Sequence, residues 1–417
     1  MHLTLLLFSS LCSLFVFTTI PFFWRGAGFS LLGASFFCCC CYFHSIPRTY
    51  TQIRTHFYGF ASFLNNYNVY QAYVHRVTMY YSVLQQQQQQ QPPLTAMPRS
   101  QVDQQERQQA LVRQSEAQQS MTEMLQQIQY IYNPDTRERA FSELTKNREK
   151  KYSGLDLGPA LWYSVGIMPI FLQELVAIYP LINSKDQMMG KRDAHRVSNM
   201  ITLIHTIALH DGSRKQLLDS QICLFLYPLL RAPPNERNDV IRLTVLGVIG
   251  ALLRYDDQQV ISYLLNSEMF PLCLDIMEAP MDTSSNEQQN DLPKVLAAYV
   301  VHKLLTSEHG LAYACHHPDR FTAIAKVLHT CVSRKDAKGK HICSSRLLRH
   351  TIRCYLRLAD NPQVSPLLPS MLPEELKNST FKEFLESDAA LKNSLLQLLV
   401  KVGDMGARRI VESERAK

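Results

Sequence analysis

Apolar side chains recur at helical spacing along most of this chain from residue 121 onward. A typical stretch, residues 242–278, reads RLTVLGVIGALLRYDDQQVISYLLNSEMFPLCLDIME. Its pattern predicts a long apolar helix, a polar break at DDQQ, and two shorter amphipathic helices, the last with a proline in its first turn. Because the long helix is apolar on most of its circumference, we expect neighbouring helices to cover it on both sides.

The same order of one long helix, a polar break and two shorter helices repeats along the chain. It covers residues 198–231, 242–278, 295–329 and 347–373. The polar breaks at Asp211, Asp256, Glu308 and Asp360 are offset by 45, 52 and 52 residues. The alternation typical of strands with hairpin turns is not sustained anywhere. The sequence therefore predicts an all-α fold, a solenoid of armadillo-type helical repeats.

Two glycines, Gly247 and Gly250, interrupt the long apolar helix of residues 242–253. A glycine in a helix interior costs about 1 kcal/mol relative to alanine. We expect this cost to be offset by the closer approach of another helix or of a ligand.

The chain divides by composition into four segments. Residues 121–402 carry the helical repeats. A Gln-rich polar lead-in precedes them at 97–120, and a polar tail follows at 403–417. Residues 1–96 contain no Asp, Glu or Lys, which would be very unusual for a folded soluble domain.

Three interpretations of residues 1–96 stay open. The stretch from Leu3 to Trp24 is apolar and long enough for a signal peptide or membrane anchor, although no Lys or Arg precedes it. A disordered extension is a second interpretation, which the aromatic content opposes. A mispredicted start is the third, because ordinary protein sequence begins near Met97. The run QQQQQQQPP at 85–93 is typical of a disordered linker.

Residues that carry catalysis or hold cofactors form no recognisable motif in this sequence. Phosphate-binding, dinucleotide-binding, nucleophile-elbow and H-E-x-x-H motifs are all missing. Cys315, His316 and His317 are adjacent, and neighbouring side chains on a helix point about 100° apart, so they are poorly placed to share one metal. The cysteines after residue 200 stand singly, as buried reduced thiols in a cytosolic protein do. We therefore expect no enzyme activity, no metal and no cofactor.

Basic residues gather on one predicted helix face. The stripe consists of Arg346, Arg349, Arg353 and Arg357. Earlier long helices add Arg196, Arg242 and Lys303. These cations form either an ordinary solvated face or a concave basic groove that meets nucleic acid or an acidic peptide. Stacking aromatic residues are not interleaved with them, so sequence-specific RNA recognition is not supported.

Six segments carry a resemblance to a known family. In order they read LWYSVGIMPIFLQELVAIYP, FLYPLLR, RLTVLGVIGALLRYDDQQVISYLL, PLCLDIME, GLAYAC and RLLRHTIRCYLRLADNP. Together they resemble the Rcd1-like cell differentiation family, the Caf40 subunits of the CCR–NOT deadenylase complex. The resemblance covers residues 121–402 and does not extend to residues 1–96.

This resemblance implies a superhelical armadillo domain of about six repeats without catalytic activity. It implies an adaptor that docks on the NOT scaffold and binds repressor proteins through short helical or tryptophan motifs, and so promotes mRNA deadenylation, decay and translational repression. The expected location is the cytoplasm, including P-bodies, and also the nucleus. Weak nucleic-acid binding and a homodimer of the free protein are further implications, with no membrane contact unless residues 1–96 are real.

The scaffold-facing helix of the family matches Trp162 to Val176 of this chain. The contact positions carried over are Trp162, Tyr163, Val165, Pro169 and Val176. Val165 and Pro169 differ from the residues expected there, which puts the fine geometry of the contact in doubt.

Two peptide sites are carried over in the same way. The groove for helical peptides matches Lys294, Leu296 and Tyr299, with Leu296 at its centre. The tryptophan-pocket region matches Gly247, Pro318 and Arg320, where Pro318 replaces an expected aromatic residue. At every one of these positions, ordinary packing within the solenoid is the competing interpretation. The competing function is a nucleic-acid-binding solenoid that acts alone through the basic groove.

Overall fold

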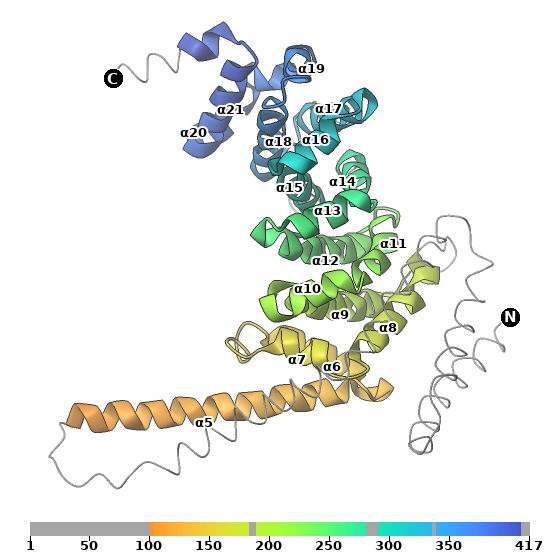
Figure 1. Ribbon diagram of the computed structural model, residues 1–417, viewed down its shortest axis with the longest axis vertical. Coiled ribbons are helices and arrows are strands. Elements are labelled where there is room, and N and C mark those ends of the chain that lie inside the picture. The colour runs from red at the N-terminus through yellow and green to blue at the C-terminus, as the bar shows by residue number, and fades with distance from the viewer. Residues whose placement is uncertain (1–100, 183–188, 281–290, 336–338, 410–417) are drawn as a thin grey trace. The chain divides into compact units, whose positions relative to one another are not determined.

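The structure, a computed structural model, describes residues 101–182, 189–280, 291–335 and 339–409 (Figure 1). All of them belong to one unit, residues 63–417. The interpretations of residues 1–96 lie outside the described ranges, as do residues 97–100 of the lead-in and 410–417 of the tail. Within these ranges no single helix is long and apolar enough to cross a membrane, and only two sharply bent helix pairs reach that length and composition.

The described residues form helices joined by short turns, which confirms the predicted all-α class. The first helices are α5 (Gln101–Tyr130), α6 (Pro134–Asn147), α7 (Leu157–Tyr163), α8 (Ile167–Ile182), α9 (Lys191–Leu209), α10 (Asp211–Asp219), η3 (Ile222–Leu226), α11 (Tyr227–Leu230) and α12 (Glu236–Leu252). There follow η4 (Leu253–Tyr255), α13 (Gln258–Asn266), α14 (Met269–Glu278), α15 (Leu292–Thr306), α16 (Glu308–Cys315), α17 (Pro318–Ser333) and α18 (Ser345–Leu358). The last are η5 (Ser365–Leu367), α19 (Leu368–Met371), η6 (Glu374–Leu376), η7 (Ser379–Phe381), α20 (Lys382–Ser387) and α21 (Ala389–Lys401).

Helices of successive repeats pack in rows (Figure 1). The long-helix row runs α6, α9, α12, α15, α18 and α21, each helix against the next. A second row pairs α7 with α10 and α13 with α16, and a third runs α8, α11, α14, α17 and α19. The predicted unit of one long and two short helices is therefore confirmed as a helical solenoid. The armadillo assignment and the number of repeats remain predictions.

The polar breaks between helices supply caps for the helices that follow. Asn235 accepts a hydrogen bond from the backbone of Asn238 at 2.8 Å, at the start of α12. Asp257 caps α13 through Gln259 N at 2.8 Å, and Ser307 caps α16 through Gly310 N at 2.9 Å. These side chains satisfy backbone donors that a helix start leaves open.

Helix α5 crosses the expected boundary at residue 120. Leu111 and Val112 in its first half are exposed. Met124 and Ile128 in its second half are buried, where α5 packs on α6 and α7. The polar lead-in is thus a helical continuation of the first helix of the solenoid.

The glycines that packing requires are not the two that the sequence singled out. A methyl group on Gly250 would lie 3.5 Å from the Tyr299 ring, and one on Gly247 would lie 3.8 Å from His205. Both are ordinary van der Waals distances, so the expected close approach at these glycines is wrong. A methyl group on Gly310 would lie 1.9 Å from the Leu304 carbonyl oxygen. No side chain fits there without moving the backbone.

Substitution of these glycines by alanine should therefore have opposite effects. Gly310→Ala should lower the free energy of unfolding by at least about 2 kcal/mol, because the clash is with backbone. Gly250→Ala should raise it by up to about 1 kcal/mol through helix propensity. Urea denaturation of both variants, followed by circular dichroism, checks this. Equal stability of the two variants would contradict the packing at Gly310.

Candidate binding surfaces

The corner between α7 and α8 projects Val165 outward. Gly166 has a φ of +89°, a left-handed conformation that glycine adopts at little cost. The helix axes on its two sides are bent by 87°. The Tyr132 hydroxyl, in the turn that follows α5, donates a hydrogen bond to the Val165 carbonyl oxygen at 2.6 Å and holds the corner in place. As a result the Val165 side chain is 56% exposed.

Helix α8 is held to the solenoid by a buried carboxylate. Glu174 is 7% exposed. Its carboxylate forms ion pairs with the Arg137 guanidinium of α6 at 2.9 Å and with the Arg196 guanidinium of α9 at 3.2 Å. Phe171 and Leu175 on the same side of α8 are fully buried. Because charges and apolar groups fix one side of α8, the opposite side faces outward.

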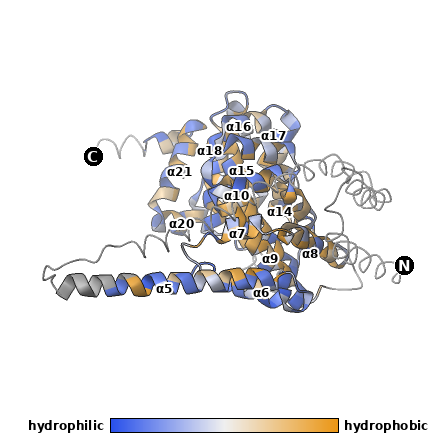
Figure 2. Ribbon diagram, turned by 60° about the horizontal axis from the view of Figure 1, so that its bottom comes forward, coloured by the Kyte–Doolittle hydropathy of each residue, from blue (hydrophilic) through white to orange (hydrophobic). Residues whose placement is uncertain are grey.

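The outward side of α8 is almost entirely apolar. We call it the α8 outer face, and it consists of Val165, Pro169, Gln173, Val176, Ala177 and Pro180, all exposed. Gln173 is its only polar side chain, and Figure 2 colours α8 largely as hydrophobic. An exposed apolar row of this kind is typical of a protein-binding surface.

Three of the five positions carried over for the scaffold contact lie on this face. They are Val165, Pro169 and Val176. Tyr163 is partly buried, and its hydroxyl donates to the Gly212 carbonyl oxygen at 3.2 Å. Trp162 is 3% exposed and packs in the core, so its assignment as a contact residue is wrong. Gln173, Ala177 and Pro180 were missed, although they continue the helical spacing from Pro169.

A second surface lies where α15 and α18 meet. Leu296 and Tyr299 on α15 are partly exposed, and their role in a peptide groove stays a prediction. The Tyr299 ring meets the His350 ring of α18 edge to face, with centroids 5.6 Å apart. Lys294 does not belong to this surface, because its side chain is buried on another side of α15.

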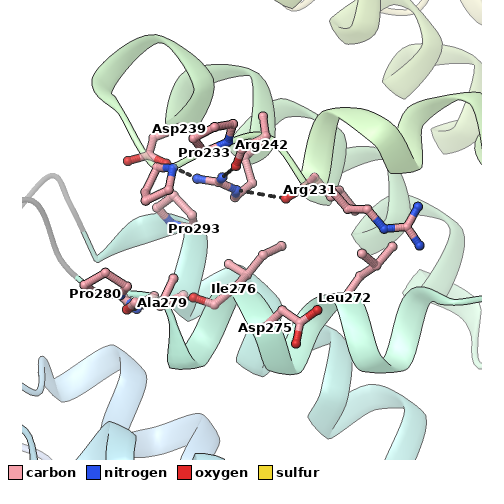
Figure 3. Close-up of a pocket in the computed structure, with 14 residues that line it drawn as sticks. Arg231, Pro233, Asp239, Arg242, Leu272, Asp275, Ile276, Ala279, Pro280 and Pro293 are labelled. Atoms are coloured by element: carbon pink, nitrogen blue, oxygen red, sulfur yellow. Dashed lines mark hydrogen bonds and ion pairs between the residues drawn. The ribbon is translucent and has the colours of Figure 1, made fainter. Parts of the chain in front are cut away.

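Lys294 and Arg242 instead border a pocket of about 290 Å³ between two repeats (Figure 3). The Lys294 ammonium donates to the carbonyl oxygens of Ile276, Met277 and Ala279, where α14 ends. The Arg242 guanidinium donates to the Leu230 and Ala232 carbonyl oxygens, where α11 ends, and pairs with Asp239. Burial lowers the pKa of Lys294 to about 8.

The pocket is therefore a joint between repeats. Its other walls are mainly apolar and include Leu272 and Ile276 across from Arg242, with four prolines around them (Figure 3). Arg137 on α6 acts in the same way two repeats before Arg242, where it donates to the Ile131 and Tyr132 carbonyl oxygens at the end of α5. Sequence reasoning missed this capping role, because a buried and an exposed cation look alike in a helical pattern.

Most cations expected to form one continuous basic surface are neutralised by acidic partners. Arg242 is buried, and Arg196 pairs with Glu174 and Asp193. Lys303 and Arg357 form ion pairs with acidic residues at the polar breaks. The pairs are Lys303–Asp256, Arg357–Glu308 and Arg357–Asp360. Arg349 pairs with Asp388. In the part of the chain that is described, Arg346 and Arg353 have no ion pair, so the continuous basic surface is wrong.

The residues carried over for tryptophan pockets are not seen together in one cavity. Gly247 lies on α12 beside His205 of α9. Arg320 stacks on the Tyr313 ring, 3.7 Å from its centroid, and donates to the Tyr313 carbonyl oxygen. Pro318 is exposed at the first turn of α17. The tryptophan pocket stays a prediction that this arrangement does not support.

The six described cysteines are buried and unpaired, as the sequence predicts. Burial raises the pKa of the Cys315 thiol to about 11, which leaves it unreactive near neutral pH. Among the described side chains, no group of three or more His, Cys, Asp or Glu could hold a metal ion.

Comparison with known proteins identifies the family. The family model "Cell differentiation family, Rcd1-like" matches residues 127–402. The chain belongs to the Rcd1-like cell differentiation family.

Two curated relatives are similar to this Rcd1-like chain. Cell differentiation protein rcd1 of Schizosaccharomyces pombe is 40% identical over 271 residues, which cover 65% of this chain and 89% of the relative. Protein CAF40 of Saccharomyces cerevisiae is 37% identical over 277 residues, which cover 66% of this chain and 69% of the relative. A solved engineered protein aligns at 11% identity over 67% of this chain and 96% of its own, with a TM-score of 0.44, too low to bear on the fold.

Loss of the Lys294 ammonium should destabilise the Rcd1-like solenoid more than loss of an exposed cation. Lys294→Met removes the ammonium from the Ile276 and Met277 carbonyl oxygens at the end of α14, whereas the Ala279 oxygen keeps Arg334 as a donor, and it should cost about 2 to 4 kcal/mol of unfolding free energy. The matched control is Lys303→Met, which removes a partly exposed pair with Asp256 and should cost less than about 1 kcal/mol. Chemical denaturation at pH 7 measures both. Equal losses would contradict the capping role.

Stability should also fall on acidification through two histidines. Burial, and the neighbouring cations, lower the pKa of His302 and of His350 to about 4. The unfolded chain then binds more protons than the folded chain between pH 6.5 and 4, so stability is full above 6.5 and declines as pH falls. Each histidine should cost about 2 kcal/mol between pH 7 and pH 5. Thermal melts of the protein and of a His302→Gln/His350→Gln variant should show a flatter pH profile in the variant.

Proposed function

We propose that this protein is a non-catalytic adaptor subunit of the CCR–NOT deadenylase complex. It docks on the NOT scaffold through the α8 outer face and binds short motifs of mRNA-associated repressor proteins. By holding the deadenylase near a bound transcript, it raises the effective concentration of enzyme at the mRNA and promotes deadenylation, decay and translational repression. The cytoplasm, with its P-bodies, and the nucleus are its expected locations.

The observation that carries this proposal is the α8 outer face in a chain of the Rcd1-like family. Five of its six side chains are apolar, and the Glu174 clamp on the opposite side fixes their direction. A fixed apolar row at helical spacing suits a partner that presents apolar side chains of its own. The relative named CAF40 supports the assignment to the complex.

The competing function, a nucleic-acid-binding solenoid that acts alone, has less support. Such binding depends on several cations that neutralise phosphates. Arg242 is buried in a capping role, and Lys303, Arg349 and Arg357 already have carboxylate partners. Steep salt dependence of RNA binding, lost on reversal of Arg349, Arg353 and Arg357, would favour that function.

A single charge on the α8 outer face should abolish docking. Val165→Glu and Val176→Glu each place a carboxylate in the apolar row, and desolvation of that charge should weaken scaffold binding by at least about tenfold. The measurement is a pull-down of the full-length protein from a lysate of the source cells, with mass spectrometry of the NOT scaffold and deadenylase subunits.

The matched control is Leu367→Glu. Leu367 is 51% exposed, close to Val165 at 56%, but lies on η5 far along the chain. Circular dichroism must show that all three variants stay folded. Scaffold recovery that is unchanged in both valine variants would overturn the proposed interface, and failure of the unmodified protein to recover the scaffold would overturn the adaptor function.

A further inference from the structure

Tyr255 lies in the polar break between α12 and α13, on a turn that presents its ring to solvent. It is the last residue of η4 and is 48% exposed. Asp256, the next residue, has a φ of +49°, in the left-handed region that residues other than glycine seldom adopt. Such conformations gather at functional positions, so this turn is a candidate for a role beyond helix packing.

Two guanidinium groups flank the Tyr255 ring. The guanidinium carbon of Arg214 on α10 lies 4.1 Å from the ring centroid, and that of Arg254 on η4 lies 5.7 Å from it. The face of the ring attracts both cations. A group attached to the Tyr255 hydroxyl would therefore lie within reach of two arginines that come from different elements.

Both arginines can still bind an anion. Nη1 of Arg214 lies 2.9 Å from Oδ1 of Asp211, but it is buried and forms no aligned hydrogen bond among the described residues. Arg254 is exposed and has no ion pair in the described part of the chain. A phosphate group matches this arrangement, because guanidinium groups bind two of its oxygens side by side.

We propose that Tyr255 is a phosphorylation site for a tyrosine-specific protein kinase and that Arg214 and Arg254 hold the phosphate. The Tyr255 oxygen attacks the γ-phosphorus of ATP, the bond from that phosphorus to the bridging oxygen breaks, and ADP leaves with the electron pair of that bond. The hydroxyl proton passes to a carboxylate of the kinase. This inference goes beyond the proposed function, because it concerns α10 and η4 and not the α8 outer face.

The acidic residues beside Tyr255 already have partners. Asp256 pairs with Lys303 at 2.6 Å, and the Asp257 carboxylate accepts a hydrogen bond from Gln259 N at 2.8 Å. These partners reduce the repulsion between the two carboxylates and a phosphate. The same carboxylates give a kinase a charge pattern to recognise on the C-terminal side of the tyrosine.

Two other tyrosines lack this combination of features. Tyr130 is 40% exposed, but its hydroxyl accepts a hydrogen bond from Gln126 at 2.8 Å, and no arginine is seen over its ring among the described residues. Tyr313 has Arg320 over its ring at 3.7 Å but is only partly exposed, and Arg320 donates to the Tyr313 carbonyl oxygen. Tyr255 combines exposure with two arginines that can bind an anion.

The phosphate would join α10 to η4. It carries nearly two negative charges at pH 7 and has three acceptor oxygens. With Arg214 on α10 and Arg254 on η4, it adds charge-assisted hydrogen bonds between two neighbouring repeats. We expect the phosphorylated protein to melt about 2 °C higher than the unmodified protein.

The test uses the full-length protein, a purified tyrosine kinase catalytic domain of broad specificity, ATP and Mg²⁺. Mass spectrometry of peptides measures the phosphorylated fraction at Tyr255 and at Tyr130, the matched exposed tyrosine. We expect a several-fold larger fraction at Tyr255. Tyr255→Phe, treated in parallel, should lose that phosphate alone, together with the rise in melting temperature.

Arginine variants test whether these side chains hold the phosphate. A purified protein tyrosine phosphatase domain is added to the phosphorylated protein, and mass spectrometry follows the phosphate at Tyr255 over time. Arg214→Gln and Arg254→Gln should each lose it about fivefold faster, because a phosphate held by one guanidinium is more accessible. Arg231→Gln, which changes a half-exposed arginine after α11, is the matched control and should lose phosphate at the unmodified rate. Circular dichroism must show that the variants stay folded.

Three outcomes would overturn the proposal. Tyr255 could take up no more phosphate than Tyr130, both arginine variants could lose phosphate at the unmodified rate, or phosphorylation could fail to raise the melting temperature. Scaffold recovery in the pull-down is measured separately and depends on α8, so failure at Tyr255 leaves the adaptor function standing.

Discussion

Stacking in this solenoid depends on how the carbonyl oxygens at the interior ends of α5, α11 and α14 are hydrogen-bonded. A helix that ends inside a protein exposes carbonyl oxygens, and each one left without a donor costs about 1 to 3 kcal/mol. Arg137, Arg242 and Lys294, each on a long helix, donate to these oxygens at the ends of α5, α11 and α14. One repeat therefore completes the hydrogen bonding of the repeat before it, and their relative position is fixed.

The same chemistry positions the surface on which the proposed function rests. The Arg137 guanidinium donates to the end of α5 through Nε, and its other N–H groups remain available. One of them pairs with Glu174, which also pairs with Arg196. This buried pair holds one side of α8 against α6 and α9. A row of apolar side chains on the other side of α8 is thereby turned outward. The ion pairs of Glu174 fix the direction of the outer face. An apolar face that is held in place before binding loses little entropy when a partner binds.

The exposed side of α8 agrees with what the family resemblance implied, but the ion pairs of the basic residues were not predicted. Val165, Pro169 and Val176, which the resemblance carried over, are exposed, and their contact with a scaffold stays a prediction. The stripe from Arg346 to Arg357 was interpreted as one basic surface, although acids from other repeats neutralise Arg349 and Arg357. These partners lie about 40 to 50 residues away along the chain, and a local pattern does not show them.

By itself the sequence determined the all-α class, the order of long and short helices, the polar breaks and the buried cysteines. Each of these features depends on contacts between residues close together in the sequence or on the spacing of apolar residues. Only the tertiary structure decided that Trp162 and Lys294 are interior, that Gly310 rather than Gly250 must lack a side chain, and that His350 meets Tyr299. Those outcomes depend on which repeat packs against which side of a helix, and that is set by neighbours distant in the sequence.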